Sequence, residues 1–196
     1  MEYELAEVFE SLQGEGRNAG RPCVFVRFAG CNLACPWCDT DVRPRFSLPL
    51  DGLLREVSGF RAKSVVLTGG EPTAVRSGMP ELVAALKARG YWIAVETNGT
   101  NAADWLAFVD YVACSPKAEY ADRLRLRTAD EVRVVASSPD VAAFCASVRR
   151  RVAATDYYVS PCDRGGSIDF ATAKEVLSGL DGWSLSVQLH KLLGFR

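Results

Sequence analysis

Short apolar runs alternate with amphipathic stretches along most of the chain, and this alternation limits the folds that it can adopt. The segment 22–30, PCVFVRFAG, is typical of a strand, because β-branched and aromatic residues stand between a proline and a glycine. The stretch 77–89 has the spacing of an amphipathic helix, with Ser77 as the expected cap and Gly90 as the expected stop. Strands that alternate with helices in this way predict βαβ units and a mostly parallel sheet.

The same patterns recur to the end of the chain. Further strands are predicted over residues 64–72, 91–99, 110–117, 131–139, 156–161 and 183–191, and further helices near 102–107, over 140–151 and near 169–178. A closed eight-unit barrel typically needs about 250 residues, and this chain has room for roughly six strand–helix units. We therefore expect an incomplete, open (β/α)6-type partial TIM barrel with extra edge strands, formed by residues 1–196 as a single domain.

Charge and hydropathy exclude two classes of partner. The 23 basic residues nearly balance the 24 acidic ones, which gives no sign of a nucleic-acid partner. No apolar run approaches the roughly 20 residues needed to cross a bilayer. The first ten residues, MEYELAEVFE, lack the basic start and apolar run of a secretory signal. We therefore expect a cytoplasmic protein that binds neither nucleic acid nor membrane.

Polar residues follow several of the expected strands. They are the segments Gly69-Gly70-Glu71, Glu96-Thr97-Asn98, Ser115-Pro116-Lys117 and Ser160-Pro161-Cys162. Parallel barrels and open parallel sheets carry their chemistry at the carboxyl ends of the strands. Each segment suits a substrate site there, and each also suits an ordinary turn.

Three of the seven cysteines, Cys31, Cys35 and Cys38, lie directly after the first of these strands, in the loop 31–40. In a reducing compartment, clustered cysteines indicate metal or redox chemistry and not a disulfide framework. A structural zinc site is one interpretation, but it needs a fourth ligand, and the only histidine is the distant His190. Three thiolates favour a [4Fe–4S] cluster that keeps one iron open for another ligand.

The spacing C-x3-C-x-aromatic-C, formed by Cys31, Cys35, Trp37 and Cys38, resembles that of the radical S-adenosylmethionine (SAM) enzymes. In that superfamily the open iron binds the amino and carboxylate groups of SAM. One electron from the reduced cluster then cleaves SAM to a 5′-deoxyadenosyl radical. The segment 69–72, GGEP, strengthens the resemblance, because such a segment holds the methionine amino group in the superfamily.

Further motifs resemble the 7-carboxy-7-deazaguanine synthase family, from about residue 3 to residue 196. They are the segment 11–16 (SLQGEG), Arg27, Cys38-Asp39-Thr40, the segment 96–99 (ETNG), Ser115-Pro116-Lys117 and the segment 188–191 (QLHK). The resemblance implies conversion of 6-carboxy-5,6,7,8-tetrahydropterin into 7-carboxy-7-deazaguanine, on the route to queuosine. The adenosyl radical removes hydrogen from C6 of the pterin, the ring contracts and ammonia leaves. The enzyme is thus expected to be a carbon–nitrogen lyase that regenerates SAM.

The resemblance also implies roles by position. Cys31, Cys35 and Cys38 are expected to ligate the cluster, and the hydroxyl of Thr40 to coordinate Mg²⁺, an ion that prefers oxygen ligands. The residues expected to bind SAM are Trp37, Cys38, Asp39, Gly70, Glu71, Ser115, Pro116, Lys117, Ser160, Pro161, Cys162 and Asp163. Those expected to bind the pterin are Leu12, Gln13, Gly14, Glu15, Arg27, Thr68, Glu96, His190 and the terminal carboxylate of Arg196.

Two of these expectations have a physical basis as well. The planar guanidinium of Arg27 suits bidentate binding of a substrate carboxylate, and a structural ion pair with Glu15 or Glu96 is its alternative. The expected strand 183–191 would complete the substrate pocket and carry His190. The chain departs from the family pattern at Ser160 and Cys162, and near the end at Leu189, Leu192 and Gly194.

The resemblance further implies a homodimer and a flavodoxin-type electron donor. Self-association also suits an open barrel with exposed edges. Two other functions remain as alternatives. One is a radical SAM activating enzyme for glycyl-radical proteins, which shares the cysteine spacing. The other is a non-catalytic binding protein stabilised by zinc or by a cluster.

Overall fold

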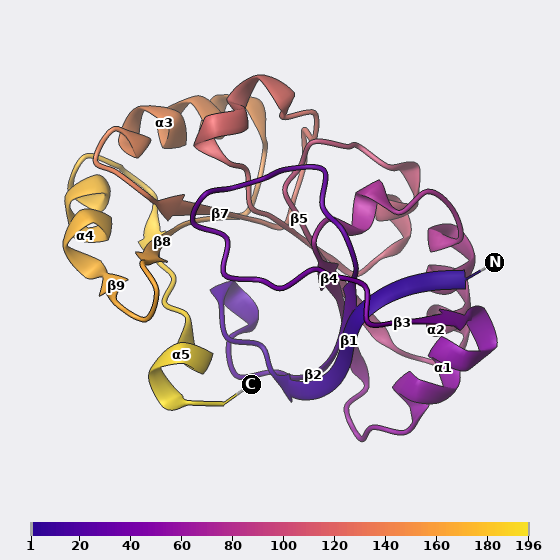
Figure 1. The fold of residues 1–196 in the computed structure, drawn as a ribbon. Helices are drawn as coiled ribbons and strands as arrows, with labels where there is room; N and C mark the ends of the chain where they lie inside the picture. The colour runs from indigo at the N-terminus through magenta and orange to yellow at the C-terminus, as the bar shows by residue number, and fades with distance from the viewer. Residues whose placement is uncertain (1, 196) are drawn as a thin grey trace.

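The structure is a computed structural model that describes residues 2–195, and one mixed sheet runs through it (Figure 1). The strands are β1 (Glu2–Leu12), β2 (Pro22–Phe28), β3 (Phe46–Pro49), β4 (Ser64–Gly69), β5 (Trp92–Thr97), β6 (Tyr111–Cys114), β7 (Glu131–Ala136), β8 (Asp156–Asp163), β9 (Ile168–Asp169) and β10 (Ser184–Leu185). Their order is β10-β8-β7-β6-β5-β4-β2-β1-β3, and β9 pairs with β8.

Seven neighbouring strands of this sheet, from β2 to β10 in the spatial order, run parallel. The strands β1 and β3 are antiparallel additions at the other edge. The two outer strands, β10 and β3, are not neighbours, so the curved sheet stays open. The expected fold, an open partial barrel with extra edge strands, is confirmed.

The α-helices of residues 2–195 are α1 (Leu50–Ser58), α2 (Met79–Ala88), α3 (Val141–Arg151), α4 (Phe170–Ser178) and α5 (Leu189–Leu193). Short 3-10 helices are η1 (Gly16–Asn18), η2 (Pro72–Ala74), η3 (Asp104–Phe108) and η4 (Ala118–Arg123). The helices α1 to α4 cover the outside of the curved sheet, while η1 and α5 lie toward its opening (Figure 1). None of the helices in residues 2–195 combines the length and the apolar character needed to span a bilayer.

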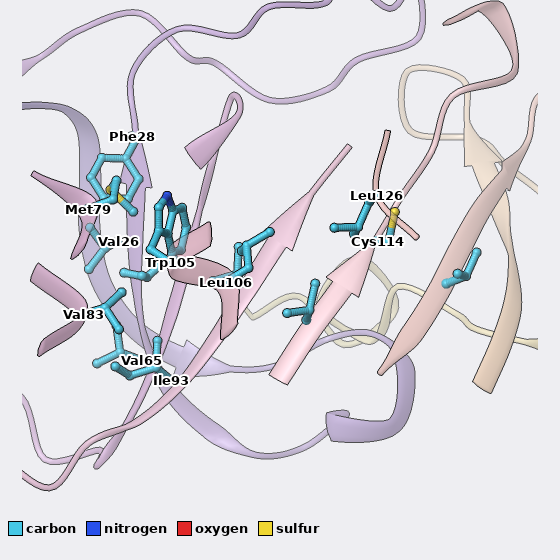
Figure 2. Close-up of a cluster of buried hydrophobic side chains, with 14 of the residues drawn as sticks. Val26, Phe28, Val65, Met79, Val83, Ile93, Trp105, Leu106, Cys114 and Leu126 are labelled. Atoms are coloured by element: carbon cyan, nitrogen blue, oxygen red, sulfur yellow. The ribbon is translucent and has the colours of Figure 1, made fainter. Parts of the chain in front are cut away.

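The two faces of the sheet have different cores. On the outer face, alternate residues of the parallel strands pack against the helices, and Figure 2 shows Val26 and Phe28 beside Met79 of α2. On the inner face, a smaller apolar cluster contains Phe25, Val66 and Ala94. Because both faces are covered, these strands appear in the sequence as continuous apolar runs. Beyond the inner cluster, the inner face carries polar residues.

The predicted strand 183–191 is wrong over most of its length. Only Ser184 and Leu185 pair with β8, and α5 begins at Leu189. The N–H of Ser186 still donates to the carbonyl of Val159 on β8. The backbone then leaves the sheet, and the N–H of Leu189 donates to the carbonyl of Gly14 instead. The alternation of apolar residues in this segment therefore does not reflect a sheet.

Two smaller expectations about helices also need correction. The cap of α2 is Gly78, with a φ of 89°, and not Ser77. Glycine is favoured there because that left-handed conformation strains residues with a side chain. The helix expected near 102–107 is the 3-10 helix η3. The sequence patterns did not predict α1.

The loop after β4 lies directly against the loop after β2. The N–H of Gly70 donates to the carbonyl of Phe28 at 3.1 Å, and the N–H of Glu71 donates to the carbonyl of Gly30 at 3.1 Å. A Cβ at position 70 would collide with the carbonyl oxygen of Gly30. Glycine at 70 is therefore what allows the two loops to touch.

We expect Gly70→Ala to lower the free energy of unfolding by about 2–3 kcal/mol, because the clash involves backbone that can move only with both loops. Urea unfolding measures this. Gly179→Ala is the matched control, since a Cβ there meets nothing within 4 Å. The control should stay within about 0.5 kcal/mol of wild type, and equal midpoints for both variants would contradict the close-approach account.

Candidate active site

The three clustered cysteines lie in the long loop between β2 and β3, drawn in purple in Figure 1. Cys31 and Cys38 are exposed, Cys35 is half-buried, and none of them is in a disulfide. The loop starts at the carboxyl end of β2, beside the glycine turn after β4. This is the edge of the sheet where the sequence places the polar segments.

The three thiols are neighbours that influence one another electrostatically. Within residues 2–195, no group of three Cys, His, Asp or Glu side chains is close enough to hold one metal ion. Burial raises the pKa of Cys31 and of Cys35, and the charge of a neighbouring Cys38 thiolate acts in the same direction. The ammonium of Lys117 favours both thiolates. Three free cysteines in one loop are the kind of donors that hold an iron–sulfur cluster, so the donor set fits that cluster.

The helix η4 holds the cysteine loop in place, which the sequence did not predict. Three of its side chains form hydrogen bonds to the loop. Glu119 accepts from the indole N–H of Trp37 at 2.9 Å, the Tyr120 hydroxyl donates to the Ala34 carbonyl at 3.1 Å, and Arg123 donates to the Asn32 carbonyl at 3.2 Å. The indole of Trp37 also has the ammonium of Lys117 at 5.2 Å from its centroid. The aromatic residue of the cysteine motif is therefore fixed beside one of the predicted SAM residues.

Glu71 organises the loops after β4 and β5. Its side chain is 1% exposed, and one oxygen accepts hydrogen bonds from the hydroxyls of Thr73 and Thr97 at 2.6 and 2.7 Å. The other oxygen accepts from the backbone N–H of Asn98 at 2.6 Å. Four protein donors, including the N–H of Thr73, thus occupy this carboxylate. The buried side chain links the two predicted segments, GGEP and ETNG.

The end of β8 offers a polar group without a protein partner. Tyr157 and Val159 belong to the outer core, so Ser160 faces the inside of the curve. Its hydroxyl is buried and has no hydrogen-bond partner among residues 2–195. Buried hydroxyls normally find a partner. The predicted SAM segment 160–163 therefore presents an unpaired donor and acceptor to the site.

Four predicted pterin residues meet in one hydrogen-bond network. One oxygen of Glu96 accepts from the side-chain amide of Gln13 at 3.1 Å, and the other accepts from the hydroxyl of Thr68 at 2.9 Å. The N–H of Glu15 donates to the side-chain carbonyl of Gln13 at 3.1 Å. Segments separated by more than 80 residues are thereby brought together. Leu12, by contrast, ends β1 with 39% of its surface exposed.

Arg133 also belongs to this network, although the sequence motifs did not predict it as a site residue. Its guanidinium donates to Glu15 at 2.7 Å and to Glu96 at 2.9 Å, and it also forms an ion pair with Glu131. Burial by itself would raise the pKa of Glu96, but the charge of Arg133 lowers it to about 2. The available signal was EVRVV, residues 131–135, in which charged residues alternate with valines along a buried strand.

Arg27 has a different partner from the two that the sequence suggested. Its Nε donates to Glu7 at 2.7 Å across the β1–β2 pairing, and not to Glu15 or Glu96. The pair is partly exposed, with 20% of the Arg27 side chain accessible. The structural alternative for this arginine is therefore a cross-strand ion pair.

The C-terminal segment closes against the site. His190 lies in α5 and not on a strand, and its imidazole packs so tightly on Gly14 that a Cβ there would collide with Nδ1. Gln188 donates to Glu15 at 2.7 Å. Lys191 forms ion pairs with Asp163, at 2.7 Å, and with Asp39 of the cysteine loop. The expected contribution of Arg196 lies outside the described residues.

We expect Gly14→Ala to push the His190 imidazole out of place by on the order of 1 Å, and to weaken turnover of a substrate bound there by up to about 100-fold. Steady-state kinetics checks this, and SAM affinity should not change. The double variant Gly14→Ala/His190→Ala provides the control. It should recover the thermal stability that Gly14→Ala loses, and no coupling between the two substitutions would count against the contact.

Comparison with known proteins agrees with the geometry. Residues 25–139 match the family model described as the Radical SAM superfamily. The chain is 43% identical to 7-carboxy-7-deazaguanine synthase of Neisseria meningitidis, with 100% of this chain and 95% of that protein covered. It is 41% identical to the enzyme of the same name from Haemophilus influenzae, covering 99% of this chain and 94% of that one.

A solved structure supports the fold separately. The crystal structure of QueE from Escherichia coli has a TM-score of 0.76, covers 97% of this chain and 95% of its own, and is 24% identical. The resemblance inferred from the motifs is confirmed, and a radical SAM protein uses a [4Fe–4S] cluster and SAM. The chain belongs to the 7-carboxy-7-deazaguanine synthase family of the radical SAM superfamily.

Proposed function

We propose that this protein converts 6-carboxy-5,6,7,8-tetrahydropterin into 7-carboxy-7-deazaguanine with loss of ammonia, as a lyase of queuosine biosynthesis. Relatives with that enzyme name over the whole length of the chain support the reaction. The observation that carries the proposal is the network of Gln13, Glu15, Thr68 and Glu96 on the inner face of the sheet. It lies at the strand ends from which the cysteine loop also starts.

Cys31, Cys35 and Cys38 would hold the cluster. The chemistry that a bound cluster and SAM supply is a one-electron cleavage that produces a carbon-centred radical able to abstract hydrogen. Around them, Trp37, Cys38 and Asp39, Gly70 and Glu71, the segment 115–117 and the segment 160–163 would form the SAM pocket. The unpaired hydroxyl of Ser160 supports this, because a polar ligand would satisfy it. Glu71 would act through its loop, since its own carboxylate is occupied.

The pterin would bind through hydrogen bonds to two carboxylates and to His190. Glu15 and Glu96 can accept from the N–H groups of the amino edge. Gln13 and Thr68 orient the carboxylate of Glu96, and Gln188 orients that of Glu15. Arg27 would bind the substrate carboxylate, and Leu12, Gly14 and the Arg196 carboxylate would complete the wall. The helix α5 would exclude water, because Lys191 ties it to Asp39 and Asp163 on two sides of the opening.

We further propose Mg²⁺ as a cofactor, held by the hydroxyl of Thr40 and by substrate oxygens. Thr40 is half-buried, and its hydroxyl oxygen is 3.3 Å from the carboxylate of Asp39, so two oxygen groups of the kind that Mg²⁺ prefers lie side by side. We propose further that residues 1–196 form one radical SAM domain, which the continuous sheet supports. The proposal also includes that the protein forms a homodimer and receives its electron from a flavodoxin-type reductant.

An anaerobic assay tests the function directly. The reconstituted protein, given SAM, Mg²⁺, a reductant and 6-carboxytetrahydropterin, should form 7-carboxy-7-deazaguanine while SAM is recovered. Mass spectrometry of the products and of SAM measures both. SAM cleavage without any deazapurine would contradict the proposal and would favour a radical SAM enzyme with another substrate.

Substitution of the cysteines tests the cluster ligands. We expect Cys31→Ala, Cys35→Ala and Cys38→Ala each to lose the iron and sulfide of a [4Fe–4S] cluster and its visible absorbance. Cys145→Ala, in the core of α3, is the matched control and should retain both. Cys162→Ala should also keep a full cluster. Loss of iron in that variant would mean that the fourth iron is not open for SAM.

A further inference from the structure

Arg133 occupies the centre of a buried charge network on the inner face of the sheet. It lies on β7, where Val132 and Val134 face the outer core, so its side chain points to the inner side. Only 7% of the side chain is exposed. Its three nitrogens face three carboxylates. The partners are Glu15 at 2.7 Å, Glu96 at 2.9 Å and Glu131 at 2.9 Å.

The three carboxylates differ in depth. The side chain of Glu131 is 2% exposed and is occupied from other directions, because it accepts from the hydroxyl of Tyr111 and the N–H of Arg17, each at 2.9 Å. The side chains of Glu15 and Glu96 are 18% and 25% exposed. Glu131 therefore holds the guanidinium from the buried side. Glu15 and Glu96 bind it from the more exposed side, where a ligand could reach them.

We propose that Arg133 is a positioning residue for the substrate: it sets Glu15 and Glu96 as a pair of hydrogen-bond acceptors at a fixed spacing for the amino edge of the pterin. This rests on the proposed function. The planar fork of arginine donates to its partners in fixed directions, whereas the ammonium of a lysine is a point charge on a flexible stem and does not fix the spacing of two carboxylates in the same way. Two glutamines further restrict the two acceptor side chains. Gln188 donates to Glu15 at 2.7 Å, and Gln13 donates to Glu96 at 3.1 Å.

Arg133 also decides the protonation state of Glu96. Burial raises the pKa of Glu96, and the guanidinium overcomes this, so that the pKa is about 2 and the carboxylate is ionised at neutral pH. Without Arg133, burial and two neighbouring carboxylates would act together to raise that pKa. A protonated Glu96 would present an O–H group to an N–H edge, and one hydrogen bond would be lost.

Other ionisable groups face this network from the surrounding strands. Burial raises the pKa of Tyr111 on β6, and it raises that of Cys23 on β2 to about 11. Burial likewise raises the pKa of Tyr158 on β8. These groups stay neutral at physiological pH. Arg17 and Asp156 pair with each other at 2.6 Å. His190 is present in wild type and in every variant. Its effect on pterin affinity is therefore common to all the pH profiles, and the comparison between them reports on Glu96.

Equilibrium binding of 6-carboxytetrahydropterin to the anaerobic, cluster-loaded enzyme with SAM tests the inference. For Arg133→Met we expect the Kd to rise at least about tenfold at neutral pH, a loss typical of charge-assisted hydrogen bonds. The sign of the pH effect follows from Glu96. Its pKa is higher in the variant, so affinity should fall further as the pH drops from about 8 to about 5, more steeply than in wild type. KM should rise more than kcat falls, and SAM affinity should not change.

Two further variants complete the design. Arg133→Lys keeps the buried charge and should lie between wild type and Arg133→Met. Arg150→Met, at an exposed position near the end of α3, is the control and should bind as wild type does. If Arg133→Met does not fold, Arg133→Lys decides: unchanged pterin affinity overturns the inference, and weakened affinity with intact SAM binding supports it.

Two results would overturn the inference for Arg133→Met itself. One is a pterin Kd within twofold of wild type across the pH range. The other is an equal loss of SAM and pterin binding, which would indicate a general structural role. Failure of the proposed function looks different, because the wild-type enzyme would then bind SAM but not the pterin.

Discussion

A single guanidinium buried among three carboxylates is the interaction on which the inner face of this barrel depends. Breaking a buried ion pair leaves an uncompensated charge and is strongly destabilising. Here the charge of Arg133 is shared between an anchor below, Glu131, and two acceptors above, Glu15 and Glu96. Glu15 stands on the loop before β2 and Glu96 at the end of β5, so the same bonds fix the spacing of elements that are remote in sequence. Stability and the shape of the proposed substrate site therefore have a common origin in this protein.

The edge of the sheet at the strand ends is organised by close backbone contact. Gly70 allows the turn after β4 to reach the carbonyls of the loop after β2, and Glu71 then joins that turn to the end of β5. The cysteine loop is thus supported on one side by glycine backbone and on the other by the side chains of η4. A loop with three exposed or half-exposed thiols keeps a defined path because both supports are made of the protein's own hydrogen bonds.

The sequence predicted most of the sheet, because strands that are buried on both faces have an unmistakable apolar pattern, as in residues 22–28 and 64–69. Motif spacing identified the cysteine loop and the family. What it could not provide was the set of contacts between distant segments. Arg133 looked like one charge in a strand, and nothing local shows that it faces Glu15 and Glu96. The strand prediction for the segment 183–191 was wrong for the same reason, since the N–H of Leu189 donates to the carbonyl of Gly14, far away in the sequence.

The position of α5 in chain order has a consequence for biosynthesis. Lys191 binds both Asp39 and Asp163, and Gln188 binds Glu15, so this short segment joins three parts of the chain that precede it. A ribosome makes those three parts first and the helix after them. A nascent polypeptide halted before residue 188 would contain every parallel strand and all three clustered thiols, yet it would lack these bonds. Premature termination there would leave the cysteine loop, the end of β8 and the loop after β1 without the element that connects them.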